Sequence, residues 1–327
     1  MSLLVFLKLI AIFAIIALGY VADRARWLGT GDVARVLANA AFYLFIPALL
    51  FRTTARIDLH TLPWRTLAAF FVPVLGCMLA VYAVQRRAPA AGAQGAQAAV
   101  PSVRALSIGF GNTVQLGIPM ATALFGEAGL QVHLAIVSLH ALLLLTLVTT
   151  LVELDLARAH ARHHGVEHSL AATLLTTVRN TVIHPVVLPV LAGLLFNLSG
   201  ASIPALADEM LLLLAQAVVP LCLVVIGMSL AHYGMGVALL SAGWVSAAKL
   251  LLLPALVLVA GRWGAGLSGT PLAVIVVCAA LPVGSNPLLF AQRYATLEGE
   301  TTTAIVISTF SFAVTAPLWL LVLGWIG

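Results

Sequence analysis

Two asparagines that lie among glycines and prolines, each within a long apolar stretch, are the residues best suited to bind a ligand. Asn112 belongs to GFGNTVQLGIP at residues 109–119, and Asn286 belongs to PVGSNP at residues 282–287. A helix that is interrupted inside a membrane frees backbone N–H and C=O groups, which must then face protein, water or a ligand. If the two breaks met, the positive ends of the helices that follow them would attract an anion.

The two motifs supply the chemical groups that an anion site needs. Asparagine amides carry donors and acceptors, hydroxyls add further hydrogen bonds, glycines permit close approach, and prolines interrupt the helical ladder. A kinked helix with a buried asparagine bonded to its neighbour is the alternative, but matched breaks in two halves of a chain favour a binding site. The candidate substrate-binding residues are Gly111, Asn112, Thr113, Gly284, Ser285, Asn286 and Pro287.

Several further polar residues lie inside apolar stretches and are weaker candidates for substrate binding or coupling. Lys249 could offset the charge of a substrate, or it could pair with helix carbonyls. His140 could carry a coupling proton, or it could be a packed, hydrogen-bonded histidine. Gln216 and Thr309, like Ser308, could line a cavity or could form hydrogen bonds between helices.

The composition is that of an integral membrane protein. Hydrophobic residues make up 62% of the 327 residues and charged residues 8%, and the mean hydropathy is +1.11. Soluble domains usually carry about 25% charged residues. The net charge of +5 includes no dense basic run, so nucleic acid is not an expected partner. The three cysteines lie in apolar stretches and predict no metal site; no cofactor is expected, while coupling to protons or sodium stays open.

Apolar runs predict ten membrane helices. Helices are expected because an isolated strand would leave its backbone unpaired in lipid. The loops after odd-numbered segments hold ten arginines and the other loops four, so the positive-inside rule predicts the former in the cytoplasm and both termini outside. The expected location is the cell inner (plasma) membrane. The segments cover residues 3–22, 33–51, 64–84, 103–125, 129–153, 173–198, 208–231, 237–261, 270–294 and 301–326.

The chain divides into two sets of five predicted segments. Residues 1–153 and 172–327 are separated by a polar, histidine-rich stretch at 154–171, which is expected to be a solvated cytoplasmic linker rather than a metal site. Because five is an odd number, the second set must be inverted relative to the first. Prolines recur in corresponding segments, ahead of the two breaks, as transporter repeats predict. The recurring prolines are Pro47 with Pro220 and Pro73 with Pro254.

An ordered set of motifs along the chain resembles the auxin efflux carrier family, in its bacterial branch. The resemblance covers essentially the whole chain. It implies an all-α polytopic membrane protein of ten transmembrane helices, arranged as two inverted five-helix repeats with broken, crossing helices 4 and 9. The motifs are LFIPALLF at 44–51, GFGNTVQLGIP at 109–119, QAVVPL at 216–221, GMSL at 227–230, KLLLLP at 249–254 and LPVGSNP at 281–287.

The resemblance also implies a mechanism. Segments 1, 2, 6 and 7 would form a scaffold domain and segments 3–5 and 8–10 a transport domain, in a homodimer that works by elevator-type alternating access. Asparagines at the crossover receive a substrate carboxylate in this family, a role that falls here on Asn112 and Asn286. The expected function is secondary transport of small organic anions, either carboxylates such as malonate and malate or auxin-like monocarboxylates.

Two other functions stay open. A sodium-coupled symporter of the bile-acid-transporter type has a similar architecture, but sodium needs clustered oxygen ligands and no carboxylate lies deep in a predicted segment. A non-transporting membrane sensor is the second alternative. An enzyme is not expected, because the sequence contains no H-E-x-x-H or G-x-S-x-G motif and no buried pair of aspartates.

Overall fold

The protein is helical throughout the part of the chain that the computed structural model describes. That part comprises residues 3–29, 31, 33–56, 63–87, 98–164, 183, 187–233 and 238–326. Over these residues there is no β-strand, only an isolated bridge between Gly111 and Val283. The helices are α1 (Leu3–Arg24), α2 (Val33–Ala40), α3 (Ile46–Ala55), α4 (Trp64–Arg87), α5 (Val100–Gly109), α6 (Gly117–His164), α8 (Val187–Leu198), α9 (Ala205–Tyr233), α10 (Leu239–Ala247), α11 (Leu253–Val259), α12 (Gly269–Ala280), α13 (Asn286–Arg293) and α14 (Glu298–Ile326), with π-helical turns η1 (Ala41–Phe45), η3 (Ala248–Leu252) and η4 (Ala260–Gly264).

Six helical stretches of the described chain are long and apolar enough to cross a membrane, so the chain is a multi-pass membrane protein. The fourth and the ninth predicted segments are both interrupted. The fourth consists of α5 and the start of α6, and the ninth consists of α12 and α13. The stretches are Val33–Ala55, Trp64–Arg87, Gly117–Leu156, Ala205–Met228, Leu239–Gly264 and Glu298–Ile326.

The long helix α6 is two helices joined at a kink. Gly126 has φ 66° and ψ −159°, a left-handed conformation that glycine adopts without steric cost. Beyond the kink the helix continues to His164, so the first part of the expected linker at 154–171 is helical. Alanine and leucine favour helix there, and residues 165–171 lie outside the described part of the chain.

Prolines inside the apolar segments shift the helical hydrogen-bond pattern. Pro47 and Pro254 lie in the first turns of α3 and α11, directly after the π-helical turns η1 and η3. A proline has no backbone N–H, so the ladder must skip a bond near it, and a π-turn absorbs the mismatch. The turn at η3 contains Lys249 and thereby sets the direction in which its side chain leaves the helix.

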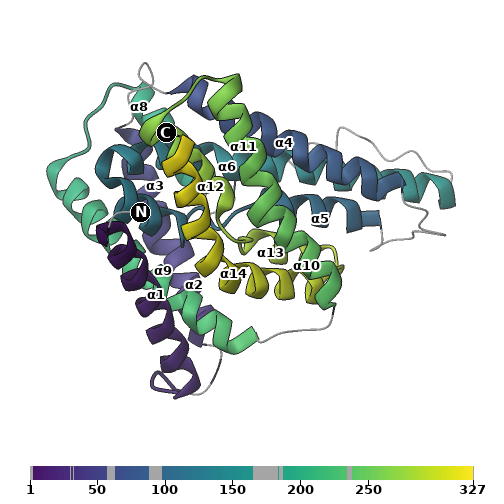
Figure 1. The fold of residues 1–327 in the computed structure, drawn as a ribbon, viewed down its shortest axis with the longest axis horizontal. Helices are drawn as coiled ribbons and strands as arrows, with labels where there is room; N and C mark the ends of the chain where they lie inside the picture. The colour runs from purple at the N-terminus through teal and green to yellow at the C-terminus, as the bar shows by residue number, and fades with distance from the viewer. Residues whose placement is uncertain are drawn as a thin grey trace.

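The helices pack as two sets (Figure 1). In the first set, α1, α2 and α3 pack around α9, and α8 packs on α3. In the second set, α4, α5, α6 and α10–α14 pack on one another. Helix α6 also contacts α1, α3, α8 and α9, so that it lies between the two sets. Arg52 and Arg56 of α3 both bind Asp208 of α9, at 2.9 and 2.6 Å, inside the first set.

Helices α1 and α9 approach so closely that their backbones touch at glycines. A Cβ atom on Gly227 would lie 1.9 Å from the carbonyl oxygen of Ile16, and one on Gly19 would lie 2.2 Å from that of Val224. Small residues at such crossings let membrane helices gain van der Waals contact that side chains would block. These two glycines therefore fix the geometry of the first set.

Candidate functional site

Two interrupted helices cross at the centre of the second set. The first break separates α5 from α6 and the second separates α12 from α13. The backbone N–H of Asn112 donates to the carbonyl of Pro282 at 2.8 Å, and the N–H of Gly284 donates to the carbonyl of Phe110 at 3.0 Å. These reciprocal bonds join the breaks as a short antiparallel bridge, so stretches some 170 residues apart along the chain form a single unit.

Glycines allow the two backbones to approach at the crossing. A Cβ on Gly284 would lie 3.0 Å from the carbonyl oxygen of Gly111 and 3.1 Å from the ring of Phe110. A Cβ on Gly111 would lie 3.3 Å from the Nζ of Lys249. Contacts of this length are tighter than most Cβ atoms make, so a side chain at either position would require its neighbours to shift by a few tenths of an ångström.

The crossing uses some of the freed backbone donors and leaves others unpaired. The N–H groups of Asn112 and Gly284 are taken by the bridge. Within the described residues, the backbone N–H groups of Val114, Ser285 and Asn286 have no protein acceptor. Freed donors at the breaks are expected from the sequence, but only the structure shows which of them bond to the opposite break.

Three buried side chains from neighbouring helices hold backbone atoms at or beside the breaks. The Nε2 of His133 in α6 lies 2.7 Å from the carbonyl oxygen of Thr113, so this nitrogen must carry the proton. Ser308 of α14 accepts a hydrogen bond from the N–H of Val283 at 3.1 Å. Lys249 donates to the carbonyl of Ala279 near the end of α12, where helix carbonyls lack partners and favour a cation.

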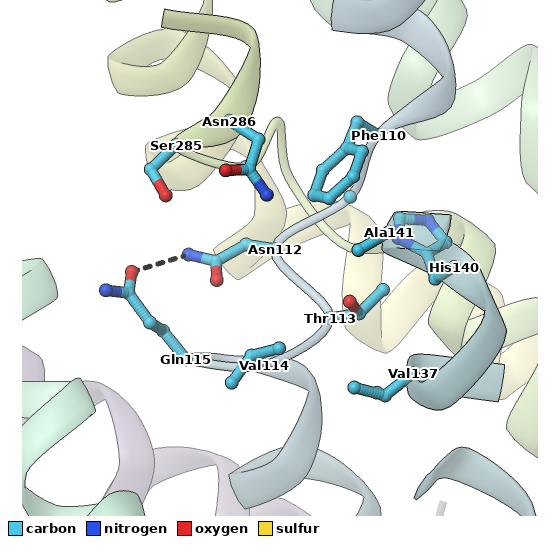
Figure 2. A pocket seen from close by; sticks show the side chains of 12 residues that line it. Phe110, Asn112, Thr113, Val114, Gln115, Val137, His140, Ala141, Ser285 and Asn286 are labelled. Atoms are coloured by element: carbon cyan, nitrogen blue, oxygen red, sulfur yellow. Dashed lines mark hydrogen bonds between the residues drawn. The ribbon is translucent and has the colours of Figure 1, made fainter. Parts of the chain in front are cut away.

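A small cavity lined by both polar and apolar residues lies at the crossing (Figure 2). Its free volume is about 20 Å³, which admits roughly one water molecule. Figure 2 shows the amide of Asn286 directed towards Asn112, whose own amide is directed to Gln115 and donates to it at 3.4 Å. The lining residues are Phe110, Gly111, Asn112, Thr113, Val114, Gln115, Val137, His140, Ala141, Gly284, Ser285 and Asn286.

Most of the candidate residues from the sequence meet at this cavity, and four do not. Pro287 is buried in the first turn of α13 and Gln216 is exposed on α9, both away from the lining. The hydroxyl of Thr309 bonds to the carbonyl of Ile305 in its own helix. Lys249 contacts the crossing from behind Gly111 rather than from the cavity.

Sequence reasoning missed several lining residues. Gln115 lies within the first motif, and its polar side chain inside an apolar stretch was a usable signal. Phe110, Val114, Val137 and Ala141 are apolar residues in apolar segments, and nothing in their types distinguishes them from core residues.

Replacing Ser308 by alanine is expected to destabilise the protein by about 1–3 kcal/mol, because the buried N–H of Val283 loses its acceptor. The matched control is Thr309→Val, which removes a hydroxyl that bonds only to its own helix and should cost less than about 1 kcal/mol. Thermal unfolding of the purified variants measures both. Equal effects would mean that Ser308 does not support the second break.

The fold and the cavity define a class of protein. A multi-pass helical protein whose interrupted helices cross beside a cavity with polar side chains in its lining has the architecture of a membrane transporter. The model of the family described as "Membrane transport protein" matches residues 4–320, so the chain belongs to this family, the auxin efflux carrier family. This is a family of transporters and not of enzymes. Among curated proteins, no match to the chain was found. The described residues contain no group of three or more histidines, cysteines or acids that could hold a metal ion.

Proposed function

We propose that the protein is a secondary transporter of small carboxylates, which it binds at the crossing of the two breaks. The observation that supports this most directly is the lining of the cavity. Asn112, Gln115, Ser285 and Asn286 place amides and a hydroxyl there, and unpaired backbone N–H groups lie beside them. Carboxylate oxygens accept hydrogen bonds from all of these donors.

The charges around the cavity favour an anion. No aspartate or glutamate is among the lining residues. The ammonium group of Lys249 lies directly behind Gly111, at 1% exposure, and a positive charge in a low-dielectric interior acts on a neighbouring anion more strongly than in water. A cation site would instead need clustered oxygen ligands with negative charge.

The packing of the helices supports an elevator-type mechanism. We assign the first set of helices to the scaffold domain and the second set to the transport domain, within two inverted five-helix repeats. Contacts between the sets are few compared with those inside each set, and the whole crossing belongs to the second set. Because the cavity admits roughly one water molecule, a substrate enters only after the sets have moved apart or the lining has widened.

We further propose the membrane orientation and assembly that the sequence predicts. The arginine-rich loops face the cytoplasm and both termini lie outside, in the cell inner membrane. Two copies associate through the predicted second and seventh segments, where large apolar side chains such as Tyr43, Leu44 and Leu213 are exposed. Cross-linking in native membranes tests the dimer.

A short carboxylate is expected to raise the melting temperature of the purified protein, because a ligand at about 100 times its Kd stabilises the bound state by about 2.7 kcal/mol. Uptake into proteoliposomes should be unchanged when choline replaces sodium, since no acid lines the cavity. A requirement for sodium would favour a symporter of the bile-acid-transporter type. Binding without uptake would favour a sensor, and no binding at any pH would refute a carboxylate site.

A further inference from the structure

The cavity has two chemically different sides (Figure 2). The amides of Asn112 and Asn286 gather on one side, at the two breaks. On the other side, helix α6 presents Val137, His140 and Ala141. The imidazole is thus the one polar side chain that α6 contributes to the lining, opposite the groups to which the proposed function assigns the carboxylate.

His140 is buried, but one of its ring nitrogens has no hydrogen-bond partner among the described residues. Its side chain is 1% exposed, and its ring packs edge-on against Phe110 with centroids 4.5 Å apart. The ring of Phe70 also lies near this imidazole, with centroids 6.1 Å apart. The Nδ1 atom has no hydrogen-bond partner within the described residues. Buried polar atoms normally have partners, and His140 is a lining residue of the cavity, so the missing partner of its Nδ1 can arrive with a ligand.

A second histidine on the same face of α6 shows what a purely structural role looks like. His133 lies seven residues before His140, which places both side chains on one face of the helix. Its Nε2 is already bonded to the carbonyl of Thr113, and it is absent from the lining of this cavity. His133 therefore positions the break, whereas the Nδ1 of His140 is left without a partner among the described residues.

We infer that His140 is a specificity-determining residue, which hydrogen-bonds a second polar group at the far end of the substrate from its carboxylate. The substrate class is then a short carboxylic acid with a hydroxyl or similar group at its other end. A hydroxyl both donates and accepts, so it suits either tautomer of the imidazole. The inference rests on the proposed function, because it takes the carboxylate to lie against the amides of Asn112 and Asn286.

The test compares two acids that differ by one hydroxyl, propionate and 3-hydroxypropionate. Titration calorimetry of the purified protein should show that the hydroxylated acid binds about 3- to 10-fold more tightly, as one hydrogen bond predicts. His140→Phe keeps an aromatic ring against Phe110 and should bind both acids with equal affinity. His140→Gln, which retains a donor and an acceptor, should keep part of the preference.

Ser138→Ala is the matched control. The hydroxyl of Ser138 lies on the same helix and bonds only to the carbonyl of Leu134 in that helix, so the preference should survive. Equal binding of the two acids by the unaltered protein, or a preserved preference in His140→Phe, would overturn the inference.

Loss of both acids in a folded His140→Phe variant would also overturn it, because His140 would then support the cavity rather than select the ligand. If His140→Phe does not fold, His140→Gln decides: a reduced ratio of the two affinities supports the inference, and an unchanged ratio overturns it. An unaltered protein that binds neither acid nor any other short carboxylate would refute the proposed function, and the inference with it. Equal binding of propionate and 3-hydroxypropionate by the unaltered protein refutes only the inference about His140 and leaves the proposed function standing.

Discussion

Replacing Asn286 by alanine is expected to weaken the binding of a short carboxylate by about 10- to 100-fold, the value of a hydrogen bond to a charged group. The side chain is 6% exposed, lines the cavity at the start of α13 and has no hydrogen-bond partner among the described residues. Its amide is thus free for a ligand, whereas the amide of Asn112 is already bonded to Gln115. Titration calorimetry of the purified variant measures the loss.

Asn286→Asp tests the sign of the ligand's charge at almost constant shape. A carboxylate beside a bound carboxylate is repelled in a low-dielectric site, so this variant should bind more weakly than Asn286→Ala. Gln216→Ala is the control, because Gln216 is exposed on α9 and does not line the cavity; its affinity should not change. Tighter binding of any substrate by Asn286→Asp would contradict an anion site and point to a cationic ligand.

Replacing Gly227 by alanine is expected to lower the stability by about 3 kcal/mol, the upper part of the range for an overpacked contact. The added methyl would lie 1.9 Å from the carbonyl oxygen of Ile16 and 2.7 Å from the backbone nitrogen of Tyr20. Backbone atoms cannot rotate away as a side chain does, so α1 and α9 must separate. Thermal unfolding in detergent measures the change.

Gly243→Ala is the control for this loss, because a Cβ at that position in α10 has no other atom within 4 Å. Alanine has the higher helix propensity, so this variant should be as stable as the unaltered protein, or more stable by about 0.5–1 kcal/mol. A similar loss in both variants would show that the contact between α1 and α9 is not as close as the structure has it.

The class of the protein and the places where its helices break follow from local features of the sequence. The apolar composition requires a membrane, because no soluble surface can be built with so few charges. Glycine and proline around Asn112 and Asn286 interrupt the helices, and they do so through their own backbone properties, whatever surrounds them. This is why the motifs predicted both the breaks and half of the residues that line the cavity.

The direction in which each buried side chain points depends on the tertiary structure. These helices are apolar on nearly all sides, so periodicity does not indicate which face turns inward. The sequence therefore left two roles open for Lys249, contact with a substrate or pairing with helix carbonyls. Only the packing of α12 against η3 directs its side chain to the carbonyl of Ala279. The same holds for Thr309, which bonds to its own helix, and for its neighbour Ser308, which supports the second break.

The sequence by itself determined that the chain lies in a membrane, where two helices are interrupted, and which polar groups the interruptions carry. Only the tertiary structure decided how the breaks pair, which of their donors stay free, and that His140 faces them from α6. The physical reason is the distance along the chain over which each effect acts. A glycine or a proline acts on its own few residues, whereas the bonds between residues 110–112 and 282–284 form only when distant segments are packed together.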